Sequence, residues 1–238
     1  NGYVQGMIKY ASMAFFGRGG CLNYEISLKY YKKASKEGSN IANYYCGLMY
    51  DHGNGTEINK EKAAKYYKKA ADHGIKKAIL NYALFLSKGI GVHQNQKEAR
   101  RYYKMSADQG DTRGMIEYGE MLQFGKGGKV DSIQAFKYYE KAMNAGDIYG
   151  MFKCAQILEK GEVIEADFKK AAHLYKKSAD GGCKNAMVCY ARMRKNGIGV
   201  PKNLQIAKEY YKKAANLGDK IAEEKYIILT KYINDNNN

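Results

Sequence analysis

The stretch "EKAAKYYKKAADHG", residues 61–74, returns in altered form along the chain and decides how the chain folds. Its tyrosine pair recurs every 36 residues. The pairs are Tyr30-Tyr31, Tyr66-Tyr67, Tyr102-Tyr103, Tyr138-Tyr139 and Tyr210-Tyr211, and Leu174-Tyr175 fills the remaining slot. A fixed period of this length is typical of repeat proteins, in which each repeat buries its apolar side against its neighbours.

The quoted stretch is predicted to form an amphipathic helix, the second helix of each repeat. Ala63, Tyr66, Tyr67 and Ala70 stand at i, i+3, i+4 and i+7, so they share one side, with lysines opposite. A glycine such as Gly74 follows every 36 residues and can adopt the left-handed conformation that ends a helix. The residue before each of these helices can cap its free N–H groups. These caps are Asn23, Asn59, Asn95, Asp131, Asp167 and Asn203.

The segment from Ser39 to His52 is predicted to be the first helix of its repeat, and it ends at a second glycine series that runs from Gly17 to Gly197. On a helical wheel, positions 43, 46, 47 and 50 lie on the buried side. Small residues such as Ala42 and Gly47 allow neighbouring helices to approach closely. The capping slot of the first helix holds Ser39, Asp111, Asp147 and Asp219 in four repeats.

These signals predict an all-α fold, an α-solenoid of about six helix-turn-helix repeats. The repeats are 2–37, 38–73, 74–109, 110–145, 146–181 and 182–217, and together with a capping segment, 218–233, they form a single domain over 1–233. A thirteenth helix from about Ile221 to Tyr232 is expected to be a polar cap, because Glu223 and Glu224 replace apolar residues there, and 234–238 is expected to be a polar tail. No comparable polar cap closes the N-terminal end, so further repeats or another domain are expected before Asn1.

The composition excludes several function classes. No apolar run reaches the length of a membrane span, and no catalytic set of residues can be assembled, so the segment is predicted not to be an enzyme. The cysteines and histidines show no metal-ligand spacing, so no metal or other cofactor is expected. Irregular free cysteines favour a reducing compartment such as the cytoplasm. The residues concerned are Cys21, Cys46, Cys154, Cys183 and Cys189, and His52, His73, His93 and His173.

The repeated template resembles the Sel1-like repeat (SLR) family, relatives of the tetratricopeptide repeats. "KAAKYYKKAADHG" and "GVPKNLQIAKEYYKKAANLGD", residues 199–219, match it closely, whereas "KGEVIEAD", residues 160–167, lacks the second loop glycine. The resemblance implies a right-handed superhelix with the first helices on the concave side and the second helices on the convex side. It also implies an adaptor role, as in endoplasmic-reticulum-associated degradation, activation of cell-wall synthases and bacterial contact with host cells.

Positions 41, 45, 48 and 52 lie opposite the buried side of the first helix, and their residues vary between repeats. We expect this row to bind a protein or an extended peptide, because exposed apolar groups often mark interaction sites. Packing against the adjacent repeat is the alternative for each single residue. The candidate binding residues are Lys9, Phe16, Tyr45, Leu48, His52, Leu84, Lys88, Arg113, Glu117, Glu120, Phe124, Tyr149, Lys153 and Arg192.

The outward side of the second helices carries most of the formal net charge of +16. Positions 65, 68 and 69 and their equivalents hold 14 basic and 2 acidic residues. We call these positions the lysine stripe, and they suggest a second hypothesis for the function. It could bind nucleic acid or an anionic surface, although specific recognition signatures are missing. The third hypothesis is a regulatory arm of a larger enzyme. The favoured function is a non-catalytic protein-interaction scaffold.

Overall fold

The structure is a computed structural model that describes residues 2–235. Within that range it consists of thirteen α-helices and contains no strand, so the predicted all-α repeat fold is confirmed. The helices are α1 (Gly2–Phe16), α2 (Tyr24–Lys36), α3 (Asn40–His52), α4 (Lys60–Asp72), α5 (Lys76–Lys88), α6 (Gln96–Asp108), α7 (Thr112–Gln123), α8 (Ser132–Asn144), α9 (Ile148–Lys160), α10 (Phe168–Asp180), α11 (Lys184–Asn196), α12 (Leu204–Asn216) and α13 (Lys220–Asp235).

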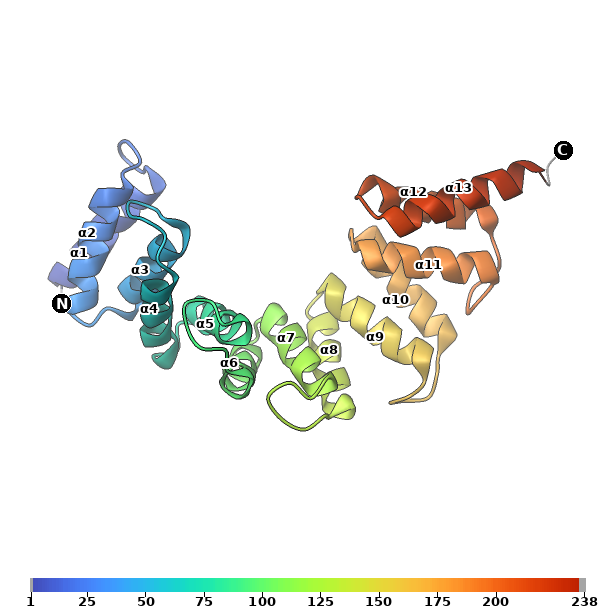
Figure 1. Cartoon of the computed structure of the whole chain (residues 1–238), viewed down its shortest axis with the longest axis horizontal. Helices are drawn as coiled ribbons and strands as arrows, with labels where there is room; N and C mark the ends of the chain where they lie inside the picture. Colours follow the sequence, from blue (N-terminus) through green and yellow to red (C-terminus); the bar gives the residue numbers. More distant parts are fainter. Residues whose placement is uncertain (1, 236–238) are drawn as a thin grey trace. The chain divides into compact units, whose positions relative to one another are not determined.

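The helices form two compact units. Unit 1 spans Asn1–Val130 and contains α1 to α7, whereas unit 2 spans Asp131–Asn238 and contains α8 to α13. Within each unit every helix packs against the helix before it and the helix after it, as the colour sequence in Figure 1 shows. A stack of this kind is held together by contacts between neighbouring repeats.

The helix starts follow the predicted capping pattern. In all six second helices the side chain of the capping Asn or Asp accepts a hydrogen bond from a backbone N–H of the first turn. The same is true of four first helices, where the caps are Ser39, Asp111, Asp147 and Asp219. Ile75 and Cys183 occupy this slot in α5 and α11 and make no such bond. Caps of this type stabilise a helix by about 1 kcal/mol each.

The loop between α11 and α12 contains a glycine at which an added side chain would collide with the preceding repeat. Gly199 has a φ of +65°, and a Cβ added there would lie 2.1 Å from the carbonyl oxygen of Phe168 at the start of α10. In the preceding repeat the equivalent position is Val163, because the loop over residues 160–167 lacks this second glycine. The glycine therefore allows the loop of one repeat to lie directly on the second helix of the repeat before it.

The core of each unit is built from alanine and tyrosine. Ala63, Ala70 and Tyr67 are fully buried in α4, and their equivalents are buried in the other second helices. All four positions of α3 that were predicted to be buried, 43, 46, 47 and 50, are buried. Gly47 lies against the ring of Tyr67, since a Cβ at Gly47 would come within 2.7 Å of it. The small residue thus makes room for the tyrosine.

The C-terminal helix is longer than the sequence indicated. The structure has α13 from Lys220 to Asp235, so the helix begins one residue before and ends three residues after the expected span of about 221–232 and includes Asn234 and Asp235. Ile233 is buried and nothing in the segment interrupts a helix, so packing extends it. The rest of the expected tail, 236–238, lies outside the described residues, and the single domain over 1–233 stays a prediction.

None of the helices in the described range is long and apolar enough to cross a membrane. All five cysteines are free thiols in the structure. Cys46, Cys154 and Cys183 are buried, Cys189 is half-buried and Cys21 is exposed. The buried cysteines therefore act as small apolar core residues.

Candidate protein-binding surface

Each first helix presents four residues at the positions equivalent to 41, 45, 48 and 52. We call these residues the first-helix row, and each unit carries its own part of it. In the six repeats none of these residues is buried, although the helices that carry them have fully buried residues on the opposite side. The row comprises positions 5, 9, 12, 16, 41, 45, 48, 52, 77, 81, 84, 88, 113, 117, 120 and 124 in unit 1, and 149, 153, 156, 160, 185, 189, 192 and 196 in unit 2.

Three aromatic residues of the row are exposed. Phe124 at the end of α7 is 59% exposed and Tyr149 in the first turn of α9 is 54% exposed, and Phe16 at the end of α1 is exposed as well. Phe16 and Phe124 each have a cation nearby, Arg18 and Lys126 respectively. Large apolar groups that remain exposed are candidate anchors for a partner.

Tyr45 packs against aromatic residues of its own helix and of the preceding repeat. Its ring stacks on Tyr31 of α2, with 4.7 Å between ring centroids and an angle of 5° between the planes. Phe15 and Tyr44 contact the same ring edge-on, at 5.7 and 5.3 Å. Tyr45 is half-buried as a result, so it contributes to the packing of α1, α2 and α3 and offers only part of its ring to a partner.

The neighbouring row residues of unit 1 combine apolar and basic groups. Leu48 and Leu84 are half-buried, whereas His52, Lys88 and Lys9 are exposed. The Nδ1 atom of His52 lies 2.9 Å from the Leu48 carbonyl oxygen of the same helix, which orients the imidazole along α3. This part of the row offers a mixed apolar and cationic surface.

The row on α7 is the acidic part of unit 1. Nε of Arg113 lies 4.0 Å from a carboxylate oxygen of Glu117 one turn later. Burial raises the pKa of Glu117, and the charge of Glu120 adds to this effect, whereas Arg113 and Lys88 oppose it. Two carboxylates one turn apart repel each other, so this position favours a cation or a hydrogen-bond donor from a partner.

The row of unit 2 is basic. Arg192 on α11 forms an ion pair with Glu159 near the end of α9, and Glu159 also accepts a 3.0 Å hydrogen bond from the hydroxyl of Tyr175 on α10. Lys153 lies 5.9 Å from the centre of the Tyr139 ring. Glu159 and Tyr175 lie outside the predicted row, and only the structure brings them to Arg192. Arg192 therefore joins α9, α10 and α11 in addition to facing outward.

A model of the Sel1 repeat matches six successive segments, residues 4–39, 40–75, 76–111, 112–147, 148–183 and 185–219. The chain belongs to the Sel1 repeat family. Sel1 repeat proteins are generally non-catalytic scaffolds for protein interaction. Within the described residues, no group of three or more His, Cys, Asp or Glu side chains is placed to hold a metal ion.

Solved structures of Sel1 repeat proteins are similar to the chain. The protective antigen c5321 of uropathogenic Escherichia coli, described as an SLR fold, is 25% identical with a TM-score of 0.87; the match covers 94% of this chain and 48% of that one. The chain thus spans about half the length of that antigen. A Sel1 repeat protein from Oxalobacter formigenes is 30% identical, with a TM-score of 0.78 and coverage of 89% and 84%. The comparison with curated proteins gave no match.

The first-helix row continues onto α13, the helix that the sequence predicts to be a polar cap. The residues 36 positions after those of α11 are Ile221, Lys225, Ile228 and Tyr232. The three large apolar residues are exposed and Lys225 is half-buried. The 36-residue register places these residues in the row, whereas Glu223 and Glu224, on which the prediction of a polar cap rests, occupy other positions of the helix.

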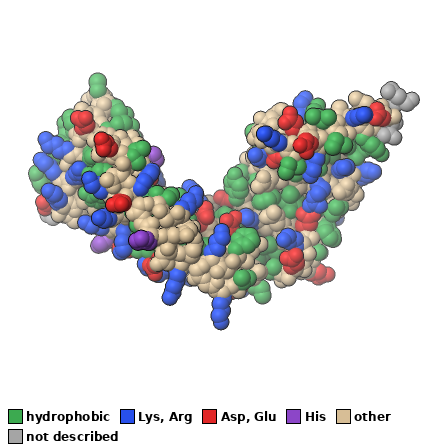
Figure 2. Space-filling view, in the orientation of Figure 1, with side chains coloured by type: hydrophobic (Ala, Val, Ile, Leu, Met, Phe, Trp, Pro, Cys, Tyr) green, Lys and Arg blue, Asp and Glu red, His purple; other side chains and the backbone are tan. Residues whose placement is uncertain are grey.

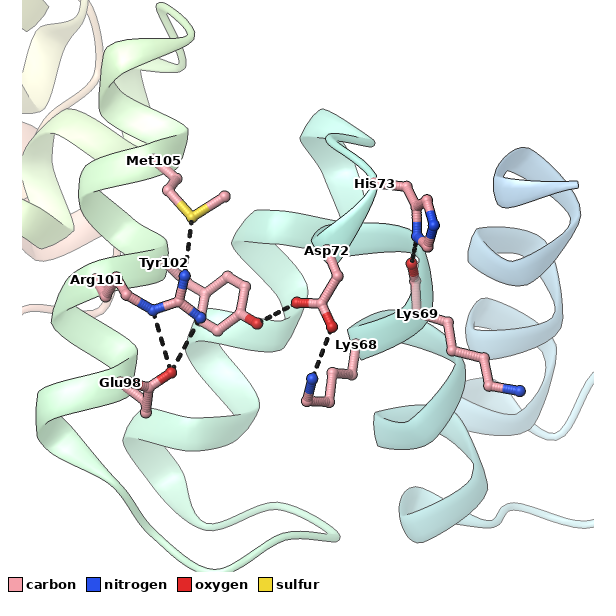
Figure 3. Close-up of polar contacts among 8 residues, drawn as sticks. All are labelled: Lys68, Lys69, Asp72, His73, Glu98, Arg101, Tyr102 and Met105. Carbon is pink, nitrogen blue, oxygen red and sulfur yellow. Dashed lines mark hydrogen bonds and ion pairs between the residues drawn. The ribbon is translucent and has the colours of Figure 1, made fainter. Parts of the chain in front are cut away.

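The lysine stripe of the Sel1 second helices is partly neutralised by ion pairs within α4, α10 and α12. Lys68 pairs with Asp72 at 2.6 Å, Lys176 with Asp180 at 2.7 Å and Lys213 with Glu209 at 2.7 Å. Figure 3 shows the first of these pairs, with Tyr102 of the next second helix donating a hydrogen bond to the same Asp72. On the face seen in Figure 2, basic and hydrophobic side chains are interspersed over the helices. The stripe thus serves in part to join successive repeats.

Proposed function

We propose that the first-helix row binds a protein or an extended peptide segment of a partner. The observation that carries the proposal is the exposure of Phe124 and Tyr149, aromatic side chains on helices whose opposite sides are fully buried. Burying one such side chain on binding contributes roughly 1.5–3 kcal/mol. The adaptor role of the Sel1 repeat family supports the same function.

The charges of the row support a partner of mixed character. Unit 1 offers Glu117 and Glu120 beside exposed aromatic and basic residues, whereas the row of unit 2 in α9 and α11 holds Lys153, Lys160 and Arg192 and no acidic residue. A basic group of a partner would be electrostatically complementary to α7, and acidic groups of a partner would be complementary to the row of unit 2. Charge would then select the partner, and the aromatic groups would supply most of the affinity.

The test begins with a peptide selected from a displayed random library on the whole chain. Its affinity is then measured for Phe124→Ala and for Tyr149→Ala, one variant in each unit. A peptide that binds to unit 1 is expected to bind Phe124→Ala about tenfold more weakly, and a peptide that binds to unit 2 is expected to bind Tyr149→Ala about tenfold more weakly. A tenfold loss of affinity corresponds to about 1.4 kcal/mol. Ile133→Ala is the matched control, because Ile133 is equally exposed but lies on a second helix. Tyr45 is unsuitable because its ring packs within the fold.

The competing function is charge attraction by the lysine stripe. A variant with Lys68, Lys69, Lys176 and Lys177 all changed to glutamate is expected to keep the peptide affinity. If only this variant abolished binding while Phe124→Ala and Tyr149→Ala had no effect, the proposal would fail. Binding to RNA that disappears between low and physiological salt would identify the stripe as a nonspecific anion-binding surface.

A further inference from the structure

In two repeats a carboxylate joins the first helix to the second. Asp51 at the end of α3 accepts a 3.1 Å hydrogen bond from the Tyr67 hydroxyl and a 2.6 Å bond from Nζ of Lys60. Glu159 of α9 is bonded in the same way by Tyr175 and paired with Arg192. The two carboxylate side chains are only 15% and 18% exposed. A tyrosine hydroxyl and a cation thus share one largely buried carboxylate in each case.

In the last repeat the corresponding position is Lys195, 36 residues after Glu159. The tyrosine that would donate to a carboxylate is present as Tyr211, but its hydroxyl has no hydrogen-bond partner among the described residues. Lys202 and Lys225 line the same space, so three lysine side chains line the pocket. None of the three forms an ion pair within residues 2–235. The donors are therefore in place and the acceptor is missing.

The position is an open pocket of about 310 Å³ between the end of α11, α12 and α13. No acidic residue lines it. Its apolar wall is formed by Leu204 of α12 together with Ile228 and Tyr232 of α13, and Ile228 is 65% exposed. Ile228 and Tyr232 extend the first-helix row of unit 2 onto α13. The pocket therefore combines three positive charges and a hydroxyl donor with an apolar surface.

We propose that this pocket binds an aspartate or glutamate side chain of a partner protein, with an apolar residue of the same segment packed on Ile228 and Leu204. The partner's carboxylate takes the place that Asp51 and Glu159 occupy in their own repeats. It accepts a hydrogen bond from Tyr211 and is paired with the surrounding lysines. Charge-assisted hydrogen bonds of this kind are about twice as strong as neutral ones. The inference rests on the proposed function, since it assigns a partner chemistry to one part of the row.

The first experiment uses three short peptides with blocked ends, containing Leu-Glu-Leu, Leu-Gln-Leu or Ser-Glu-Ser at the centre. Binding to the whole chain is followed by NMR of the isoleucine and leucine methyl groups. The Leu-Glu-Leu peptide is expected to shift the Ile228 and Leu204 signals and to bind about tenfold more tightly than the Leu-Gln-Leu peptide. Equal affinity of these two peptides would overturn the proposal. The Ser-Glu-Ser peptide is expected to bind more weakly than Leu-Glu-Leu, and equal binding would overturn the apolar contact.

The second experiment supplies the missing carboxylate from the chain itself. Lys195→Glu is expected to abolish binding of the Leu-Glu-Leu peptide and to raise Tm, because the new carboxylate can accept the Tyr211 hydrogen bond and pair with Lys202 or Lys225. Lys177→Glu makes the same change of net charge on the outer side of α10 and is expected to leave binding unchanged. An equal loss in both variants would show general charge attraction and overturn the pocket.

Tyr211→Phe tests the hydroxyl separately. Because this hydroxyl makes no hydrogen bond to any residue from 2 to 235, its removal is expected to leave Tm unchanged and to weaken binding severalfold. Unchanged binding would overturn its assigned role as donor. Dependence of a selected peptide on Tyr149 but not on Lys195 would refute the pocket and leave the row standing. Dependence on Lys195 but not on Tyr149 or Phe124 would leave the pocket standing and refute the row.

Discussion

The hydroxyl of Tyr210 in α12 donates a 2.5 Å hydrogen bond to the carboxylate of Asp180 at the end of α10. Lys176, one turn earlier in α10, pairs with the other oxygen of that carboxylate at 2.7 Å. Tyr102, Asp72 and Lys68 form the same arrangement between α6 and α4. At these two junctions the tyrosines that define the repeat therefore do more than fill the core, because they join one second helix to the next.

Removing this link should weaken unit 2. Tyr210→Phe is expected to lower the free energy of unfolding by about 1 kcal/mol. This value is smaller than that of a fully buried hydrogen bond to a charged group, because Asp180 is partly exposed and solvent screens its charge. The measurement is the shift of the urea denaturation midpoint at neutral pH. Tyr190→Phe is the control, because Tyr190 is buried beside Tyr210 and its hydroxyl makes no hydrogen bond in the described residues. An equal effect of both substitutions would contradict the link.

The same link should weaken in acid. Burial alone would raise the pKa of Asp180, but the hydrogen bonds from Lys176 and Tyr210 outweigh it and lower the pKa below the ordinary 3.8. The contribution of Asp180 is therefore fully present above the unfolded-state pKa and is lost as the pH falls through the lower, folded-state pKa. The stability difference between wild type and Tyr210→Phe should shrink from about pH 5 to about pH 2. A constant difference over this range would contradict the role of the charged carboxylate.

Two equivalent tyrosines should differ in how the loss of the hydroxyl group changes the stability of the chain. Tyr67 donates to Asp51, so Tyr67→Phe is expected to destabilise the chain by about 1 kcal/mol. The Tyr31 hydroxyl is buried and has no carboxylate partner, because Phe15 stands where Asp51 stands in the next repeat; Ser12 lies near it, but no hydrogen bond of good geometry joins it to a described residue. Tyr31→Phe is therefore expected to be neutral or stabilising. Urea denaturation of both variants decides this, and a loss of stability in Tyr31→Phe would contradict it.

Two loop glycines with similar backbone conformations should differ in their tolerance of alanine. Gly197 and Gly199 have φ values of +73° and +65°, so alanine at either costs about 1–2 kcal/mol in backbone strain. At Gly197 the nearest atom to an added Cβ is 3.4 Å away, whereas at Gly199 it is the Phe168 carbonyl oxygen at 2.1 Å. Gly199→Ala should therefore be clearly more destabilising than Gly197→Ala. Equal midpoints in thermal unfolding would show that the loop moves away freely.

The cysteines should differ sharply in reactivity. Burial raises the pKa of Cys46 and of Cys154 to about 12, so neither forms the reactive thiolate in the folded chain. Iodoacetamide at about pH 8 should modify the exposed Cys21 and leave Cys46 and Cys154 intact until urea is added, as mass spectrometry can check. Because folding raises these two pKa values from 9.0, their contribution to stability is present below that pH and is lost as the pH rises toward 12.

The repeat architecture could be predicted because its signals are local. A capping Asn203 bonds to an N–H three residues away, and Gly38 ends its helix through its own backbone conformation, so neither depends on a distant residue. The burial of Cys46 and Tyr50 followed from helical geometry in the same way. These signals recur in each of the six repeats with a period of 36 residues, so the fold class and the ends of the helices up to α12 could be predicted.

Tertiary structure decided which residues of the first-helix row contact other helices and which remain open to a partner. The sequence predicted that Tyr45 and Arg192 face away from the buried side, but their partners Tyr31 and Glu159 come from other helices, 14 and 33 residues away. Such contacts depend on side-chain conformation and on which residue the neighbouring repeat supplies. The open pocket beside Lys195 has the same origin, since a lysine in place of a carboxylate has meaning only next to Tyr211, Lys202 and Lys225. Sequence by itself determined the repeat and the side that faces outward; packing between repeats decided which outward groups are already bonded and which are left for a partner.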